Sequence, residues 1–115
     1  MSEFVDNLND VFALFGPVSA KRMFGGYGIY YRDLMFGLVV DEVLYLKADD
    51  SSVAEFVQHG SRPFEYEKNG KIMKMSYYTA PDEIYDDPEK AKEWAVRAFE
   101  TALRGRKSKS KAGRI

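Results

Sequence analysis

The sequence predicts an α+β domain of two layers, in which three helices pack an antiparallel sheet in the order α-β-β-β-α-β-β-α. Apolar residues recur at helical spacing near both ends of the chain. The middle consists of short β-prone runs separated by pairs of polar residues, and Asn69-Gly70 then joins two further β-prone segments. A length of 115 residues with 45% apolar side chains is enough for one packed core.

Three helices are expected from apolar residues spaced three and four positions apart. Glycine follows the first two helices, as is usual at helix ends. Ser52 and Glu55 have the spacing of a capping box at the start of the second helix. Asp87-Pro88 opens the third helix, with aspartate as the N-cap and proline as the first helical residue. The expected helices span residues 4–15, 52–58 and 88–103.

The central strands are expected to form a three-stranded meander, because only two polar residues separate each run from the next. Arg32-Asp33 and Asp41-Glu42 are these breaks, and neither contains the glycine that a tight primed turn favours. The predicted strands are 22–31, 34–40 and 43–47.

The hairpin around Asn69-Gly70 has a fixed register, because a two-residue type I′ turn determines which residues face each other. Its side chains then separate into a largely apolar face and a face with an ion pair. The predicted pairs are Phe64/Met75, Tyr66/Met73, Glu65/Lys74 and Lys68/Lys71.

Charge divides the chain into an acidic domain at residues 1–103, with a net charge of −7, and a basic segment at 104–115, with a net charge of +6. The segment has one large apolar residue and is expected to be a disordered tail. An acidic domain repels phosphate, so nucleic acid would be bound only weakly and through this tail. The cations available for such contacts are Arg104, Arg106, Lys107, Lys109, Lys111 and Arg114.

The chain contains no cysteine, which excludes disulfides, thiolate nucleophiles and cysteine-ligated metals. The N-terminal segment carries acids early, has no basic region and has no small-residue cleavage site, so it does not resemble a secretory signal. No apolar run approaches the ~18 residues of a membrane span. We therefore expect a cytoplasmic protein that does not interact with a membrane.

Two motifs suggest chemistry, and each has a structural alternative. The glycines in Gly25-Gly26-Tyr27-Gly28 resemble a phosphate-binding loop, but a strand rather than a helix follows them, so we interpret them as sheet geometry. His59 is the only histidine and is a candidate general base, yet no nucleophile accompanies it, and we interpret it as a helix-end residue. We therefore predict no enzymatic activity and no cofactor.

The acidic clusters and the tyrosines also have two interpretations. Asp49-Asp50 and the acids of 82–87 resemble hard-cation ligands, but both groups lie where helices begin and are expected to cap them. The tyrosines could stack on bases of a single strand, as in proteins with exposed sheets. Asp33, Asp41 and Glu42 lie close to the central basic residues in sequence, so we interpret the rings as packing.

The central segment resembles the N-terminal domain family of TfoX, the regulator of competence genes also called Sxy. The resemblance lies in the runs 22–30, 35–39 and 44–47, with support from 64–66 and 75–78, and covers about residues 3–103. Its signature residues here are Arg22, Met23, Phe24, Gly25, Gly26, Gly28, Phe36, Gly37, Leu44, Tyr45 and Lys47.

The resemblance implies a two-layer α/β domain and a role in regulating DNA uptake. Larger members act as co-activators with the cyclic-AMP receptor protein and carry a second, helical domain, whereas this sequence ends in the basic tail. It implies no catalytic residues. We expect a protein-interaction domain with a partner in the transcription machinery, able to form a homodimer through exposed sheet edges. The alternatives are a tail-driven nucleic-acid binder and a small-ligand binder or enzyme.

Overall fold

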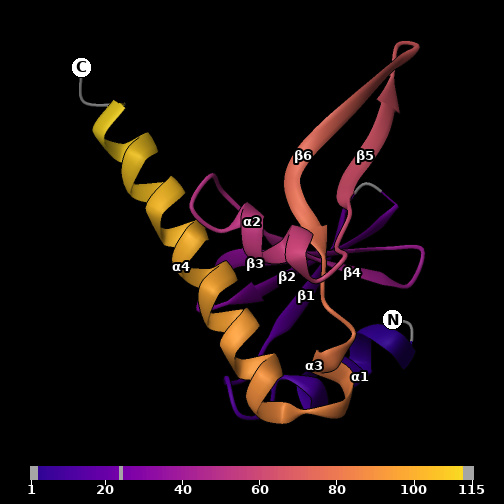
Figure 1. The fold of residues 1–115 in the computed structure, drawn as a ribbon, viewed down its shortest axis with the longest axis vertical. Helices are drawn as coiled ribbons and strands as arrows, with labels where there is room; N and C mark the ends of the chain where they lie inside the picture. The colour runs from indigo at the N-terminus through magenta and orange to yellow at the C-terminus, as the bar shows by residue number, and fades with distance from the viewer. Residues whose placement is uncertain (1–2, 24, 113–115) are drawn as a thin grey trace.

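The computed structural model of the chain describes residues 3–23 and 25–112, and within these ranges it contains one six-stranded sheet and four helices (Figure 1). Neighbouring strands are antiparallel, in the order β1-β2-β3-β4-β6-β5. The α+β fold class and the order of the predicted elements are confirmed. The strands are β1 (Ser19–Met23), β2 (Gly26–Tyr31), β3 (Leu34–Val40), β4 (Val43–Lys47), β5 (Pro63–Lys68) and β6 (Lys71–Thr79). The helices are α1 (Glu3–Val11), α2 (Val53–Gln58), α3 (Glu83–Asp86) and α4 (Pro88–Ala112).

The structure contains two elements that the sequence did not predict: β1 as a strand separate from β2, and the short helix α3. The run predicted as one strand at 22–31 is divided, because Gly25 adopts a φ of +74° and reverses the chain between β1 and β2. The four residues of α3 form a single turn that precedes α4. Ser52 is the N-cap residue of α2 but makes no side-chain cap, so the predicted capping box is absent; its hydroxyl instead accepts a hydrogen bond from the Asp49 N–H at 3.0 Å.

The turns between β2 and β3 and between β3 and β4 use two residues in the left-handed region without glycine. Arg32 and Asp33 have φ values of 49° and 64°, and Asp41 and Glu42 have φ values of 52° and 59°. Positive φ at both central residues is the geometry of a type I′ turn, whose twist matches that of antiparallel strands. The sheet therefore imposes on these residues a conformation that their side chains disfavour.

Replacing Glu42 with glycine is expected to raise the free energy of unfolding by about 0.5–1 kcal/mol. The left-handed conformation costs a residue with a side chain about 1–2 kcal/mol, and the greater unfolded-state freedom of glycine removes about 0.5–1 kcal/mol of that gain. Urea unfolding followed by circular dichroism measures the change. Glu67→Gly, near the end of β5, is the control and should lower stability. A loss of stability in Glu42→Gly would contradict the turn geometry.

The hairpin formed by β5 and β6 has the register that the sequence predicts, with Lys68 opposite Lys71 across the Asn69-Gly70 turn. Asn69 and Gly70 both have positive φ, at 53° and 77°. The far end of the hairpin projects from the rest of the molecule (Figure 1), and from Glu65 to Lys74 every residue is exposed. We call this projecting part, residues 65–74, the arm.

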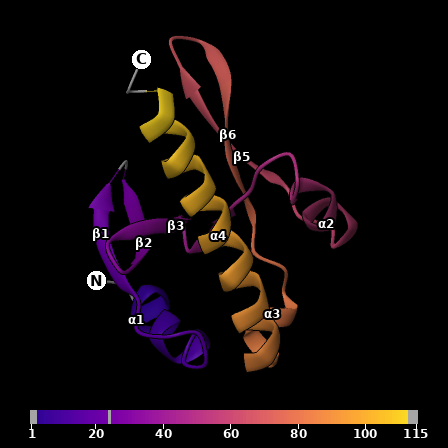
Figure 2. The same ribbon diagram turned by 90° about the vertical axis from the view of Figure 1, so that its left-hand side faces the viewer.

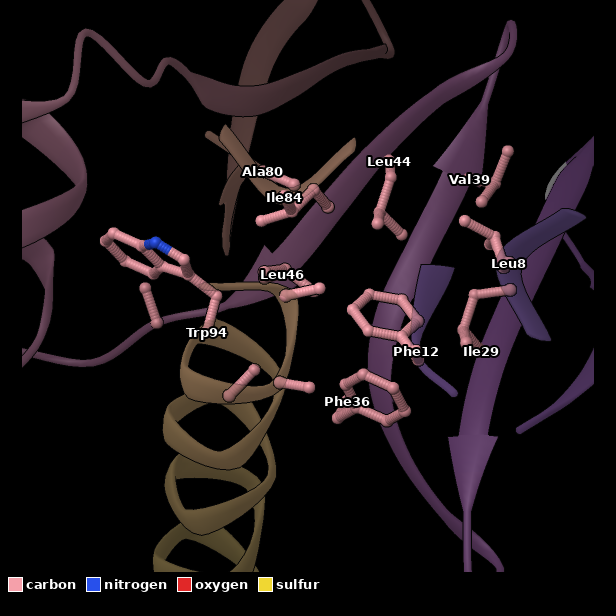
Figure 3. Close-up of a cluster of buried hydrophobic side chains, with 14 of the residues drawn as sticks. Leu8, Phe12, Ile29, Phe36, Val39, Leu44, Leu46, Ala80, Ile84 and Trp94 are labelled. Carbon is pink, nitrogen blue, oxygen red and sulfur yellow. The ribbon is translucent and has the colours of Figure 1, made fainter. Parts of the chain in front are cut away.

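The helices cover one face of the sheet, with α4 lying across β3 and β4 (Figure 2). The main core lies between these two layers and takes residues from α1, α4 and the central strands (Figure 3). Trp94 of α4 is its largest fully buried side chain. It packs at 4.9 Å from the ring of Phe56 and donates its indole N–H to Glu83 at 2.7 Å. The opposite face of the sheet carries no helix from the described residues.

The last helix begins as predicted and ends later than predicted. Asp87 caps α4 by accepting a hydrogen bond from the Glu89 N–H at 3.0 Å. Helical backbone continues to Ala112, so the expected disorder of 104–115 is corrected for residues 104–112, and 113–115 lie outside the described residues. Arg104 anchors the extension, because its guanidinium lies 3.0 Å from the Asp49 carboxylate.

Candidate functional site

His59 lies at the end of α2, where its contacts are structural. Its Nδ1 is 2.9 Å from the carbonyl oxygen of Glu55, and its Nε2 is 3.7 Å from the carboxylate of Glu83. That carboxylate also accepts the indole N–H of Trp94, whose ring packs edge-on against the imidazole. None of these partners is a nucleophile. These contacts agree with the helix-end interpretation of His59.

A cavity of about 410 Å³ lies beside His59, between the start of β4, the end of β6, α3 and the loop after α2. It contains Arg62 and Asp82, which are of opposite charge, and the buried hydroxyl of Ser61, which has no hydrogen-bond partner. Burial and the nearby Asp82 raise the pKa of Tyr85 to about 12, so its hydroxyl stays protonated at neutral pH.

The acidic clusters are distributed among separate structural contacts. Asp49 accepts a hydrogen bond from the Ser51 hydroxyl at 2.6 Å and pairs with Arg104. Burial alone would raise the pKa of Asp49, but hydrogen bonds from Ser51 and Arg104 and the charge of Arg104 hold it below its usual value. Asp87 caps α4. Among residues 3–23 and 25–112, no group of three or more acidic or histidine side chains is placed to hold a metal ion.

The glycines of the signature segment lie in a hairpin of strands and not at the start of a helix. Gly25 makes the turn, and Gly26 belongs to β2. A Cβ atom at Gly26 would lie 2.0 Å from the carbonyl oxygen of Val39 on the neighbouring strand. At Gly28 a Cβ would lie 2.6 Å from the sulfur of Met23 and 3.0 Å from that of Met35. Gly26 requires glycine because the obstacle is the backbone of the neighbouring strand, whereas at Gly28 the two methionine side chains can shift.

The other signature residues divide between the two faces of the sheet. Phe36 and Leu44 are buried in the main core under the helices. Gly37 packs beside Leu44, and Arg22 is exposed on the edge strand β1. Phe24 lies outside the described residues. Those that face away from the helices are Met23, Gly26, Gly28, Tyr45 and Lys47.

The face of the sheet opposite the helices is the largest feature that the sequence analysis missed, and we call it the open face. Its floor is a second apolar cluster built on Leu38, Phe64 and Tyr77. Because opposite residues in antiparallel strands share a side, the strand registers assign the remaining residues to it. The exposed and half-buried side chains on it include Lys21, Met23, Tyr30, Met35, Val40, Tyr45, Lys47, Tyr66, Lys68, Lys71, Met73 and Met75.

Aromatic rings and lysines contact each other across the open face. The ammonium group of Lys21 lies 4.8 Å from the centre of the Tyr30 ring, and that of Lys47 lies 5.0 Å from the Tyr77 ring. The Tyr45 ring meets Phe64 edge-on at 5.0 Å, and Phe64 stacks on the Tyr66 ring at 6.0 Å. Burial and the hydroxyl of Tyr30 raise the pKa of Tyr77 to about 12. The rings thus extend from β2 across the sheet to the arm.

Among the cations at 104–115, the structure describes the side-chain surroundings of Arg104 and Arg106. Arg104 is engaged with Asp49, Ser51 and Thr101. Arg106 lines a second cavity, of about 580 Å³, together with Lys47 and Asp33. The backbone of Lys107, Lys109 and Lys111 is helical, and Arg114 lies outside the described residues.

Comparison with known proteins identifies a family for most of the chain. A family model described as the TfoX N-terminal domain matches residues 10–102. Protein Sxy of Escherichia coli is 24% identical over 103 residues, which are 90% of this chain and 49% of the relative. DNA transformation protein TfoX1 of Aliivibrio fischeri is 33% identical over 63 residues, which are 55% of this chain and 30% of the relative.

A third relative has the same kind of name. DNA transformation protein TfoX of Haemophilus influenzae is 32% identical over 73 residues, which cover 62% of this chain and 34% of the relative. The chain therefore spans at most about half the length of these relatives. Within its described part, none of the helices combines the length and the apolar character needed to cross a membrane.

Proposed function

Because the chain belongs to the TfoX N-terminal domain family, we propose that it is a non-enzymatic regulatory domain that binds a protein partner in the control of DNA uptake. Two of the relatives are named DNA transformation proteins, and these names support the proposed role in DNA uptake. The proposed partner is a component of the transcription machinery, and the proposed place of action is the cytoplasm. The partner's binding site must lie on a surface that the folded domain leaves accessible.

The observation that carries this proposal is the exposed apolar surface of the arm. Ile72 is 66% exposed and Met73 is 41% exposed, near the end of a hairpin that projects from the molecule (Figure 1). Ile72 and Met73 point to opposite sides of the hairpin, so the residue that carries the proposal is Ile72, a large apolar side chain exposed on a projecting element. Ile72 is opposite Glu67, on the side of the hairpin that faces away from the open face.

Substitution of Ile72 with glutamate is expected to abolish the regulatory effect without unfolding the domain. In the organism that encodes this chain, deletion of the gene should lower the transcripts of DNA-uptake genes, and the unaltered gene should restore them. The Ile72→Glu gene should fail to restore them, because a buried, unpaired charge in the interface is costly. Transcript quantification, with thermal unfolding of the purified variant, measures the outcome.

The matched control is Val57→Glu on α2, which places the same charge at an apolar residue that is 59% exposed. Val57→Glu should restore the transcripts. Transcripts that are unchanged on deletion would contradict the regulatory role, and full restoration by Ile72→Glu would contradict the role of the arm.

A further inference from the structure

The charges of the sheet are sorted between its two faces. Among the strand residues, all of which the structure describes, the open face carries four lysines and no acidic residue. The two strand acids, Glu65 and Glu67, point to the other side of β5. Asp33, Asp41 and Glu42 lie in the turns at the ends of the strands. The four lysines are Lys21, Lys47, Lys68 and Lys71.

We propose that the open face binds single-stranded nucleic acid, with bases stacked on its tyrosines and phosphates held by its lysines. This inference is independent of the protein partner proposed above, because it concerns the other side of the arm and the strands beneath it. It also differs from binding through the basic C-terminal segment. The three tyrosines available for stacking are Tyr30, Tyr45 and Tyr66.

The tyrosines are placed for stacking, because their rings are held in position without being fully covered. Tyr66 is 39% exposed, and Tyr30 and Tyr45 are half-buried. They come from β2, β4 and β5, alternate strands that lie about 10 Å apart across a sheet, and the Phe64 ring contacts both Tyr45 and Tyr66. Rings of this kind accept any base, since every base has a π-face, so the binding is expected to tolerate many sequences.

The four lysines of the open face lie where they could bind the phosphates of a strand whose bases stack on these rings. Lys21 and Lys47 each lie against a tyrosine ring, and their long side chains can move from the ring to a phosphate. Lys68 and Lys71 face each other at the end of the arm, where two like charges are unfavourable without an anion between them. If all four contact phosphates, log affinity should fall with log salt with a slope of about −3.

Other anionic partners use fewer of these features. An acidic peptide would satisfy the lysines but has no flat rings to stack on the tyrosines. A DNA duplex keeps its bases paired and stacked, so it would contact the lysines alone. The combination of exposed tyrosine rings and lysines on one face free of strand acids therefore favours a single strand. The lysine–phosphate contacts make the interaction dependent on salt. The net charge of −7 over residues 1–103 repels the strand and limits its affinity.

Fluorescence anisotropy with a labelled oligo(dT) and oligo(U), each of about 12 nucleotides, tests the proposal on the full chain. At low salt the chain should bind both oligonucleotides more tightly than a duplex of the same length. Tyr66→Ala should weaken binding roughly 5- to 150-fold, the range observed on removal of a stacking ring. Lys21→Gln combined with Lys47→Gln should make the salt slope shallower by about 1.4.

Matched controls separate the open face from other surfaces. Tyr85→Ala removes a tyrosine of similar exposure, 43%, on α3, and should leave the affinity unchanged. Lys92→Gln on α4 removes an exposed lysine away from this face and should also have no effect. Replacement of Lys107, Lys109 and Lys111 by glutamine should leave the loss caused by Tyr66→Ala intact. Thermal unfolding confirms that each variant is folded.

Three results would overturn the proposal. The first is the absence of oligonucleotide binding at low salt. The second is binding that disappears with the C-terminal lysines and is indifferent to Tyr66. The third is equal competition by polyglutamate with no dependence on Tyr66, which would assign the face to an acidic protein partner instead.

Discussion

Replacing Trp94 with alanine is expected to lower the free energy of unfolding by about 3–5 kcal/mol, the usual cost of removing a large buried aromatic side chain. Trp94 is 1% exposed and contacts Phe56, His59 and Arg97. Its loss leaves a cavity between α2 and α4 and removes the donor that binds Glu83. Because Trp94 is the only tryptophan, chemical unfolding should be followed by circular dichroism and not by fluorescence.

One variant separates the contributions of packing and hydrogen bonding to this loss, and a second variant is the control. Trp94→Phe keeps most of the ring volume and removes the indole N–H, so it should cost about 1–3 kcal/mol. Val96→Ala, two positions along α4 at a residue that is 36% exposed, should cost well under 1 kcal/mol. If Trp94→Ala cost no more than Val96→Ala, the described packing of α4 against the sheet would be wrong.

Replacing Gly26 with alanine is expected to cost at least about 3 kcal/mol, at the upper end of the range for overpacked sites. The added Cβ would lie 2.0 Å from the carbonyl oxygen of Val39, a distance that real Cβ atoms do not adopt. The obstacle is the backbone of β3, so no change of side-chain rotamer relieves it, and β2 must separate from β3. Urea unfolding and the yield of folded protein measure the effect.

Gly25→Ala is the matched control for Gly26→Ala. No atom outside the neighbouring residues lies within 4 Å of its added Cβ, but its φ of +74° is unfavourable for a residue with a side chain. The expected loss of stability is therefore only about 1–2 kcal/mol. A larger effect at Gly25 than at Gly26 would show that backbone conformation, and not the approach of β3, explains the glycines in this segment.

The parts of the fold predicted correctly from the sequence are those that local chemistry determines. Asn69-Gly70 specifies a type I′ turn and so the pairing of β5 with β6, and Asp87-Pro88 specifies the start of α4. In the structure α4 continues beyond Leu103, and Arg104 there contacts Asp49, 55 residues earlier in the chain. No local pattern contains that contact, so the sequence alone indicated disorder.

The open face was not predicted for a second reason. Counted along the chain, acids such as Asp33 and Glu42 offset the charge of the basic residues nearby, Arg22, Arg32 and Lys47. In the folded sheet those acids occupy turns, and alternation along each strand places the lysines together. The predicted hairpin register already put Lys68, Lys71 and Tyr66 on one side, so this part of the surface was available from the sequence. Its continuation onto Lys21 required the order of all six strands.

The acidic side of β5 also affects how two copies of the molecule can meet. β5 is an edge strand, and such edges can pair with the same strand of a second copy to extend the sheet. With the two-fold axis at Tyr66, antiparallel self-pairing would place Glu65 directly opposite Glu67 of the other copy. Moving the axis to Glu65 or to Glu67 would place that glutamate opposite itself. Like charges opposed in this way are destabilising, so the exposed hairpin resists growth into an intermolecular sheet at neutral pH.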